Sequence, residues 1–106
     1  MYYIYILYSK TADKYYVGHS LDPLQRLEQH NTNRVEKYTG KNHDWEMKAV
    51  FEVSPVKGDA DKLEKFIKRQ KSKQLIMKLV DESFVPVDKL SMLVRVTHLR
   101  DLSGSL

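Results

Sequence analysis

The chain has 106 residues, of which 42% are apolar and 30% are charged. This size and balance fit one compact domain with a hydrophobic core, and they exclude a collagen, a linker array and a disordered chain. No cysteine is present, which excludes a disulfide scaffold, a thiolate zinc site and a cysteine nucleophile. The apolar N-terminal stretch is far shorter than the ~20 residues of a bilayer span. We therefore expect a cytoplasmic protein with no membrane contact.

The positive charge is concentrated in one segment. The net charge is +4 at pH 7. Residues 59–78 hold seven Lys and Arg against three Asp and Glu, whereas residues 1–58 hold eight against seven and residues 79–106 hold three against four. Such a density suits a polyanion whose phosphates release counterions on contact. Lysine-rich helix faces are also commonly just solvated, so charge alone leaves both interpretations open.

Two segments near the start of the chain predict a β-hairpin followed by a helix. Residues 2–8 and 15–19 are rich in tyrosine and β-branched residues, and the stretch between them is polar. Asp22 then supplies an N-cap, Pro23 suits the first helical position and Gln25 is a capping-box partner. We expect this helix to extend over about ten residues.

The remaining elements are a strand, two helices and a tail. Residues 45–53 alternate imperfectly and predict a third strand. Asp59 is the expected cap of a second helix, and Ser72 is the expected cap of a third. In the tail, Leu93 to Leu99 alternates like a strand, whereas Asp88 to Leu93 suits a helical turn.

This order of elements predicts an α/β (α+β) fold, with helices flanking a small, mostly antiparallel sheet of three strands. We expect residues 1–80 to form the domain and residues 81–106 to form a C-terminal tail packed on it. An exposed edge strand in the tail would also allow pairing with a partner protein or a second copy of the chain.

Six of the seven tyrosines lie in the first sixteen residues. With an even-length turn, Tyr5 shares a face of the hairpin with Tyr16 and Gly18, whereas an odd-length turn selects Tyr15 instead. Strand tyrosines are usually packing residues with a hydrated hydroxyl. A glycine within a strand, however, commonly marks a bulge or a place where a ligand comes close.

These residues resemble a known family. Tyr3-Ile4-Tyr5 and Tyr16-Val17-Gly18, with ten residues between Tyr5 and Tyr16, are similar to the paired strand motifs of the GIY-YIG nuclease superfamily. Tyr3 stands where the family has Gly, and Val17 stands where it has Ile. The resemblance is closest to short stand-alone members related to the N-terminal nuclease domain found in the C component of excinuclease ABC.

Three later segments strengthen the resemblance. They are similar to the family's helix that carries Arg and then His, to a motif of its small members, and to the helix that presents its metal-binding glutamate. The segments are, in that order, residues 22–31, residues 37–39 and residues 63–68.

The resemblance implies the GIY-YIG endonuclease fold and a metal-dependent endonuclease that hydrolyses DNA phosphodiester bonds by in-line attack of water. Structure-specific cleavage and DNA repair are the implied settings, and RNA stays open as a substrate. The alternative is a catalytically silent nucleic-acid-binding module of the same fold, whose basic helix and tyrosines bind the nucleic acid.

The resemblance also implies a metal-binding role for Glu64. Its helical position lies toward the apolar side, where a carboxylate needs a partner. Oxygen ligands and the absence of thiolates favour a single Mg²⁺ or Mn²⁺ ion. The alternative partner is Lys68, which lies four residues on and can form an ordinary helix ion pair.

The other catalytic candidates are Tyr5, Tyr16, Arg26 and His30. Arg26 would grip the phosphate and stabilise its developing charge, and His30 would relay a proton or orient Tyr5. Free tyrosine has a pKa of ~10, but nearby cations favour the phenolate. We expect Tyr5 to be the base and Tyr16 to position water or phosphate, although the two roles are interchangeable in the motif.

A third set of residues is expected to contact the substrate without sequence preference. Gly18 would let the strand approach the substrate backbone, and the side chains of the set would contact flanking phosphates. The expected substrate-binding residues are Gly18, Tyr38, Lys62, Lys65, Lys68, Arg69 and Lys71.

Overall fold

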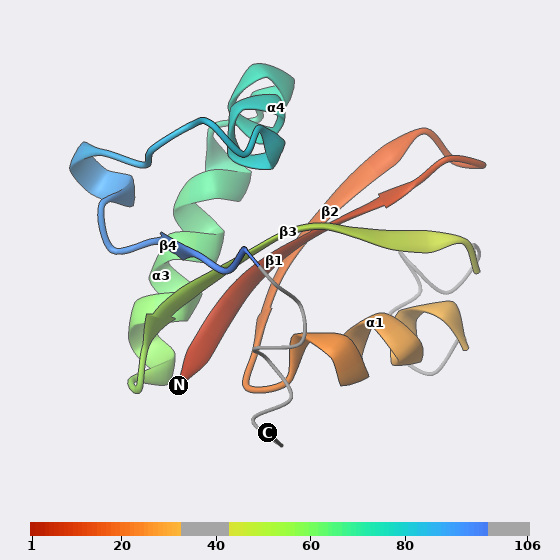
Figure 1. Ribbon diagram of the computed structural model, residues 1–106, viewed down its shortest axis with the longest axis horizontal. Helices are drawn as coiled ribbons and strands as arrows, with labels where there is room; N and C mark the ends of the chain where they lie inside the picture. The colour runs from red at the N-terminus through yellow and green to blue at the C-terminus, as the bar shows by residue number, and fades with distance from the viewer. Residues whose placement is uncertain (33–42, 98–106) are drawn as a thin grey trace.

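The computed structural model describes residues 1–32 and 43–97. Within this part the chain forms one antiparallel sheet with the strand order β2-β1-β3-β4 (Figure 1). The strands are β1 (Tyr2–Ser9), β2 (Lys14–Ser20), β3 (Trp45–Ser54) and β4 (Val94–Arg95). The predicted α+β class is confirmed, but the sheet has four strands rather than three, because the tail contributes β4.

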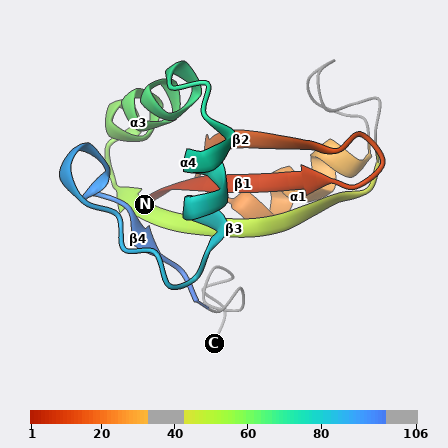
Figure 2. The ribbon, with the colours of Figure 1, turned by 90° about the horizontal axis from the view of Figure 1, so that it is seen from above.

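Three α-helices flank the sheet in the described part of the chain. α1 covers one face, and α3 and α4 pack on the opposite face, with α3 on the side of the sheet where β2 forms the edge (Figures 1 and 2). The helices are α1 (Pro23–Asn31), α3 (Lys57–Arg69) and α4 (Lys73–Val80), and a 3₁₀ turn, η1, covers Asp88–Leu90.

The hairpin register decides which tyrosines share a face. Tyr5 pairs with Gly18 and Leu7 pairs with Tyr16, so β1 and β2 are joined by an even turn of residues 10–13. Side chains alternate along each strand, which places Tyr5, Tyr16 and Gly18 on the face that α1 covers. The alternative with Tyr15 on this face is therefore wrong.

A hydrophobic core lies on each side of the sheet. Ile4 and Ile6 of β1 pack with Leu63, Ile67 and Leu79 of α3 and α4. On the α1 side the core consists of Tyr5, Leu7, Tyr16, Trp45 and Val50, with Leu27 of α1 packed against it. Each fully buried side chain of this size contributes about 1.5–3 kcal/mol, so β1 is held from both faces.

The helix starts follow local capping chemistry, with one exception. Asp22 accepts a hydrogen bond of 3.1 Å from the Gln25 amide, as predicted for α1. Ser72 caps α4 through the Leu75 amide at 3.1 Å, which confirms two separate helices. The predicted cap at Asp59 is wrong: α3 begins at Lys57, and the Asp59 carboxylate accepts a hydrogen bond from Ser54 instead.

Asp44 links the turn of the β1–β2 hairpin to the start of β3 through hydrogen bonds. Its carboxylate accepts hydrogen bonds from Ser9 Oγ at 2.6 Å and from the Thr11 amide and hydroxyl at 2.9 and 2.8 Å. The Ser9 hydrogen bond, followed by those from Thr11, lowers the pKa of Asp44 to about 2. The carboxylate therefore stays ionised, and this connection holds, well below neutral pH.

The tail joins the same core through a short strand. Leu90 and Leu93 are buried among the side chains of α3 and α4, and β4 pairs with Phe51 and Glu52 of β3. The predicted strand over Leu93–Leu99 is therefore wrong in extent: Leu93 is a core residue before β4, and Leu99 lies outside the described residues. None of the described helices is long and apolar enough to cross a membrane.

Candidate functional site

An open cleft of about 500 Å³ lies beside β1 and β2, between the start of α1 and the inner side of α3. We call it the tyrosine cleft. Its lining includes Tyr5 and Tyr16 from the hairpin, Arg26 from α1, Glu64 from α3 and two residues that sequence reasoning did not select, His19 and Lys57. Four of the five predicted catalytic side chains thus meet in one cleft, although they come from four separate elements.

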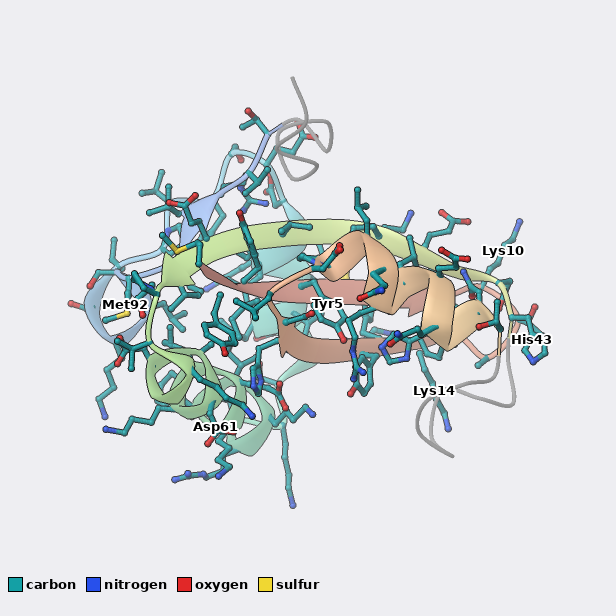
Figure 3. The ribbon with its side chains drawn as sticks, turned by 90° about the horizontal axis from the view of Figure 1, so that it is seen from below. Tyr5, Lys10, Lys14, His43, Asp61 and Met92 are labelled. Carbon is teal, nitrogen blue, oxygen red and sulfur yellow. The ribbon has the colours of Figure 1, made fainter. Side chains whose placement is uncertain are left out.

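Tyr5 forms the floor of the cleft and is completely buried. Its hydroxyl lies 3.0 Å from Nε2 of His30, which is also completely buried, in the last turn of α1. Figure 3 looks onto the face of the sheet that α1 covers and shows Tyr5 near the middle of the sheet, beside α1. A hydrogen bond in such surroundings is costly to break, because either partner would be left buried and unsatisfied. His30 therefore fixes the position of the Tyr5 hydroxyl.

Gly18 makes room for the Tyr5 phenol. A Cβ atom at Gly18 would lie 2.6 Å from both Cζ and Oη of Tyr5, and 3.0 Å from Cε2 of Tyr16. The glycine was expected to allow close approach of a substrate backbone. The close neighbour that the structure gives it is instead the Tyr5 side chain, across the strand pair.

Tyr16 lies nearer to solvent than Tyr5. Its ring centroid is 6.3 Å from that of Tyr5 and 4.9 Å from that of His30, and 7% of the residue is exposed. Lys68 Nζ lies 5.0 Å from the centroid of the ring, where a cation is attracted to the aromatic face. Tyr16 is therefore the phenol beside both a cation and the cleft opening.

Glu64 has two partners at the side of the cleft. One carboxylate oxygen lies 2.6 Å from His19 Nδ1, and the other accepts a hydrogen bond of 2.9 Å from Lys68 Nζ. The side chain is 16% exposed. The ion pair with Lys68 that the spacing allowed is thus present. His19 was missed, although strand alternation places it with Val17 on the face that α3 covers.

The cationic side of the cleft is formed by Arg26 and Lys57. Arg26 Nη1 donates a hydrogen bond of 3.3 Å to Gln29 Oε1, one turn along α1, which orients the guanidinium. Lys57 begins α3, and no motif in the sequence marked it. Together they add two positive charges to the cleft that contains the carboxylate of Glu64.

The donor set fits a magnesium-like ion only if substrate completes the coordination. The described residues contain no cluster of three or more His, Asp and Glu side chains. Asp22 also lines the cleft, but its carboxylate caps α1. Mg²⁺ commonly binds through one or two carboxylates, several waters and substrate phosphates. Glu64 can supply such a carboxylate once Lys68 or His19 releases the Glu64 oxygen that it contacts.

The predicted phosphate-contacting residues fall into three groups. Lys68 and Lys71 line a second cleft next to the first. Lys62, Lys65 and Arg69 lie on the outer side of α3 and line neither of these two clefts. Lys65 forms an ion pair of 3.0 Å with Asp61, which lowers the pKa of that carboxyl. Tyr38 lies outside the described residues.

Comparison with known protein families matches residues 1–79 to the GIY-YIG catalytic domain. The chain belongs to this family. The match runs from the start of the chain into the last turn of α4 and includes every described residue of the tyrosine cleft. GIY-YIG domains are endonucleases, so the fold is of the nuclease type and the family implies a nucleic-acid substrate. No significant match was found among curated proteins.

In this GIY-YIG domain we predict that Gly18→Ala displaces Tyr5. The new methyl group would overlap the phenol, and moving the phenol aside would break the buried hydrogen bond of its hydroxyl to His30, so unfolding should become easier by about 1–3 kcal/mol. Thermal unfolding followed by circular dichroism measures the loss. Gly58→Ala is the control, because its added methyl group meets nothing closer than 4.0 Å. Equal melting temperatures for Gly18→Ala and the wild type would contradict this packing.

Proposed function

We propose that the chain is a metal-dependent endonuclease that hydrolyses phosphodiester bonds in DNA. The observation that carries the proposal is the convergence of Tyr16, Arg26 and Glu64 on one open cleft. Hydrolysis of a phosphodiester needs a group to activate water, a cation for the phosphate oxygens and a ligand for a divalent ion. Each need has a side chain of suitable chemistry in this cleft.

Glu64 is the proposed ligand of a single Mg²⁺ or Mn²⁺ ion. When bound, the ion polarises the phosphate and makes its water ligand more acidic. Lys68 and His19 hold the carboxylate in place beforehand. Lys68 can then turn toward the substrate phosphate without leaving the cleft border, because its side chain is 45% exposed.

Arg26 and Lys57 are the proposed phosphate clamp. A guanidinium can donate two parallel hydrogen bonds to phosphate oxygens and stabilises the charge that develops on them. The hydrogen bond to Gln29 limits the rotation of Arg26 before substrate arrives. Less orientational freedom is then lost on binding.

The burial of the two tyrosines supports Tyr16 as the group that activates water. Tyr5 was expected to be the base, but its side chain is completely buried and its hydroxyl is engaged with His30. Tyr16 also lines the cleft, is slightly exposed, and has the ammonium of Lys68 over its ring. We therefore assign proton removal to Tyr16 and a positioning role to the Tyr5–His30 pair.

The setting of the reaction belongs to the same proposal. The likeness of the sequence to the N-terminal nuclease domain in the C component of excinuclease ABC supports branched or damaged DNA as the substrate and DNA repair as the process. A chain without cysteine has no thiol to oxidise and suits the reducing cytoplasm. If the chain binds nucleic acid and cuts none, the silent binding module of the same fold is the correct account.

We predict that Glu64→Gln abolishes cleavage and leaves DNA binding within about threefold of the wild type. The amide keeps the shape but removes the charge that holds the metal ion, whereas affinity resides in the lysines. Cleavage of labelled single-stranded, duplex and branched DNA with Mg²⁺ or Mn²⁺ measures the first effect, and fluorescence anisotropy in EDTA measures the second.

Glu82→Gln is the matched control, because Glu82 is an exposed residue beyond α4, outside the cleft lining. This variant should cut like the wild type. Cleavage by Glu64→Gln at the wild-type rate, or wild-type cleavage that persists in EDTA, would contradict the role of Glu64.

We also predict different effects for the two cleft tyrosines. Tyr16→Phe should slow cleavage by at least about 100-fold, the lower end of the contribution of general bases, with little change in melting temperature. Tyr5→Phe leaves the buried imidazole of His30 without its phenol partner and should also cost about 1–3 kcal/mol of stability. Single-turnover cleavage and thermal unfolding measure both effects.

Tyr8→Phe controls for the loss of a phenol, since the Tyr8 hydroxyl binds Asp13 near the turn of the hairpin. A normal cleavage rate for Tyr16→Phe together with an inactive but stably folded Tyr5→Phe would reverse the assignment.

A further inference from the structure

A second open cleft, of about 630 Å³, lies between β2 and the junction of α3 with α4. We call it the lysine cleft. Of the residues that the structure describes, four lysines and one aspartate line it, whereas the tyrosine cleft has two basic residues, Arg26 and Lys57, and two carboxylates. The four lysines are Lys14, Lys68, Lys71 and Lys73. Excess positive charge is therefore found beside the proposed catalytic cleft rather than in it.

The two clefts meet at Tyr16. Tyr16 lines both of them, and Lys68, which lines the lysine cleft, bonds to Glu64 of the tyrosine cleft at 2.9 Å. A nucleic-acid strand with one phosphate at Glu64 and Arg26 would place its neighbouring nucleotides in the lysine cleft. The neighbouring cleft is thus positioned for the nucleotides that flank the scissile phosphate.

The walls of the lysine cleft suit bases as well as phosphates. Tyr15 and Tyr16 line it together with the apolar side chains of Val17, Ile67 and Ile76. Basic grooves with aromatic walls are typical of proteins that bind single strands, because bases stack on the rings while lysines contact the backbone. The volume is that of a pocket for a small molecule, so it suits one or two nucleotides rather than a duplex.

Lys71 occupies a backbone position that usually belongs to glycine. It follows the last turn of α3 with φ of +48°, and its amide bonds to the Lys68 carbonyl at 3.2 Å. A left-handed residue at this point of a helix end is most often Gly, since a Cβ atom is disfavoured there. A lysine at this position lines the cleft at a cost in stability.

We propose that the lysine cleft binds the single-stranded flank of the nucleic acid whose scissile phosphate occupies the tyrosine cleft. This inference rests on the proposed nuclease function. It adds Lys14 and Lys73 to the substrate-binding residues. It also assigns a smaller contribution to nucleic-acid affinity to the outer side of α3, whose residues Lys62, Lys65 and Arg69 line neither cleft. Figure 3 shows Lys14 at the turn of the hairpin, on the side of the sheet that β2 borders.

Binding measured without cleavage tests the proposal. The probes are a short fluorescein-labelled single strand of DNA and the blunt duplex of the same sequence, titrated in EDTA at several salt concentrations. The triple variant Lys14→Gln, Lys71→Gln, Lys73→Gln should weaken single-strand binding by at least about tenfold. The slope of log affinity against log salt concentration should become less steep by about two, since each of the three lost phosphate contacts contributes ~0.7 to this slope.

The matched control removes the same number of charges from the outer side of α3. The variant Lys62→Gln, Lys65→Gln, Arg69→Gln should weaken single-strand binding by less than about threefold. An equal or larger loss in this control would overturn the proposal, as would an equal loss of duplex and single-strand binding in the cleft variant. A wild-type chain that binds neither probe would also overturn it.

Lys71→Gly separates binding from folding. Its melting temperature should be equal to or above that of the wild type, because glycine accepts the left-handed backbone, while single-strand affinity should fall by about two- to threefold. Unchanged affinity would contradict the role of Lys71. A wild-type chain that binds the strand through this cleft but cuts no DNA would overturn the nuclease function alone.

Discussion

The packing of the Tyr5 phenol against Gly18 is the constraint on which the site depends. The ring fills the space that a Cβ atom would occupy, and its hydroxyl bonds to His30. These contacts join β1, β2 and α1 beneath the tyrosine cleft. Only glycine at position 18 leaves room for the phenol. Tyr16 and Arg26 then reach the opening of the cleft because the strands and the helix beneath them are held at fixed spacing.

Charge is arranged around this scaffold in two neighbouring clefts. In the tyrosine cleft, the carboxylate of Glu64 is held by one histidine at one oxygen and by one lysine at the other. The same lysine borders the second cleft, where three further lysines gather. α3 contributes to both clefts, because it carries Glu64 and, one turn later, Lys68, and it leads into the junction with α4 where Lys71 and Lys73 lie. The proposed chemistry and the proposed strand binding therefore share one helix and one tyrosine.

The parts of the fold with local signals could be predicted from the sequence. Asp22 and Ser72 cap their helices and the hairpin forms as expected, whereas the sequence left the register of the hairpin open between an even and an odd turn. The tail strand was one of two alternatives, and its extent and its pairing with β3 could not be predicted, because the two residues of β4 are placed by Leu90 and Leu93 entering a core built by other elements. The same reason explains why the sequence did not indicate His19 and Lys57 as site residues, or Lys14 and Lys73 as residues of one cleft. Their positions depend on how α3 and its junction with α4 pack beside β2.

The central claim is that a divalent ion and a phosphate meet in the tyrosine cleft. The most direct measurement is paramagnetic broadening of amide NMR signals by Mn²⁺, in the presence of a short nucleic-acid strand that the chain binds. The account predicts strongest broadening at His19, Arg26 and Glu64, and its loss in Glu64→Gln. Broadening centred elsewhere in the chain, or unchanged by that substitution, would contradict it.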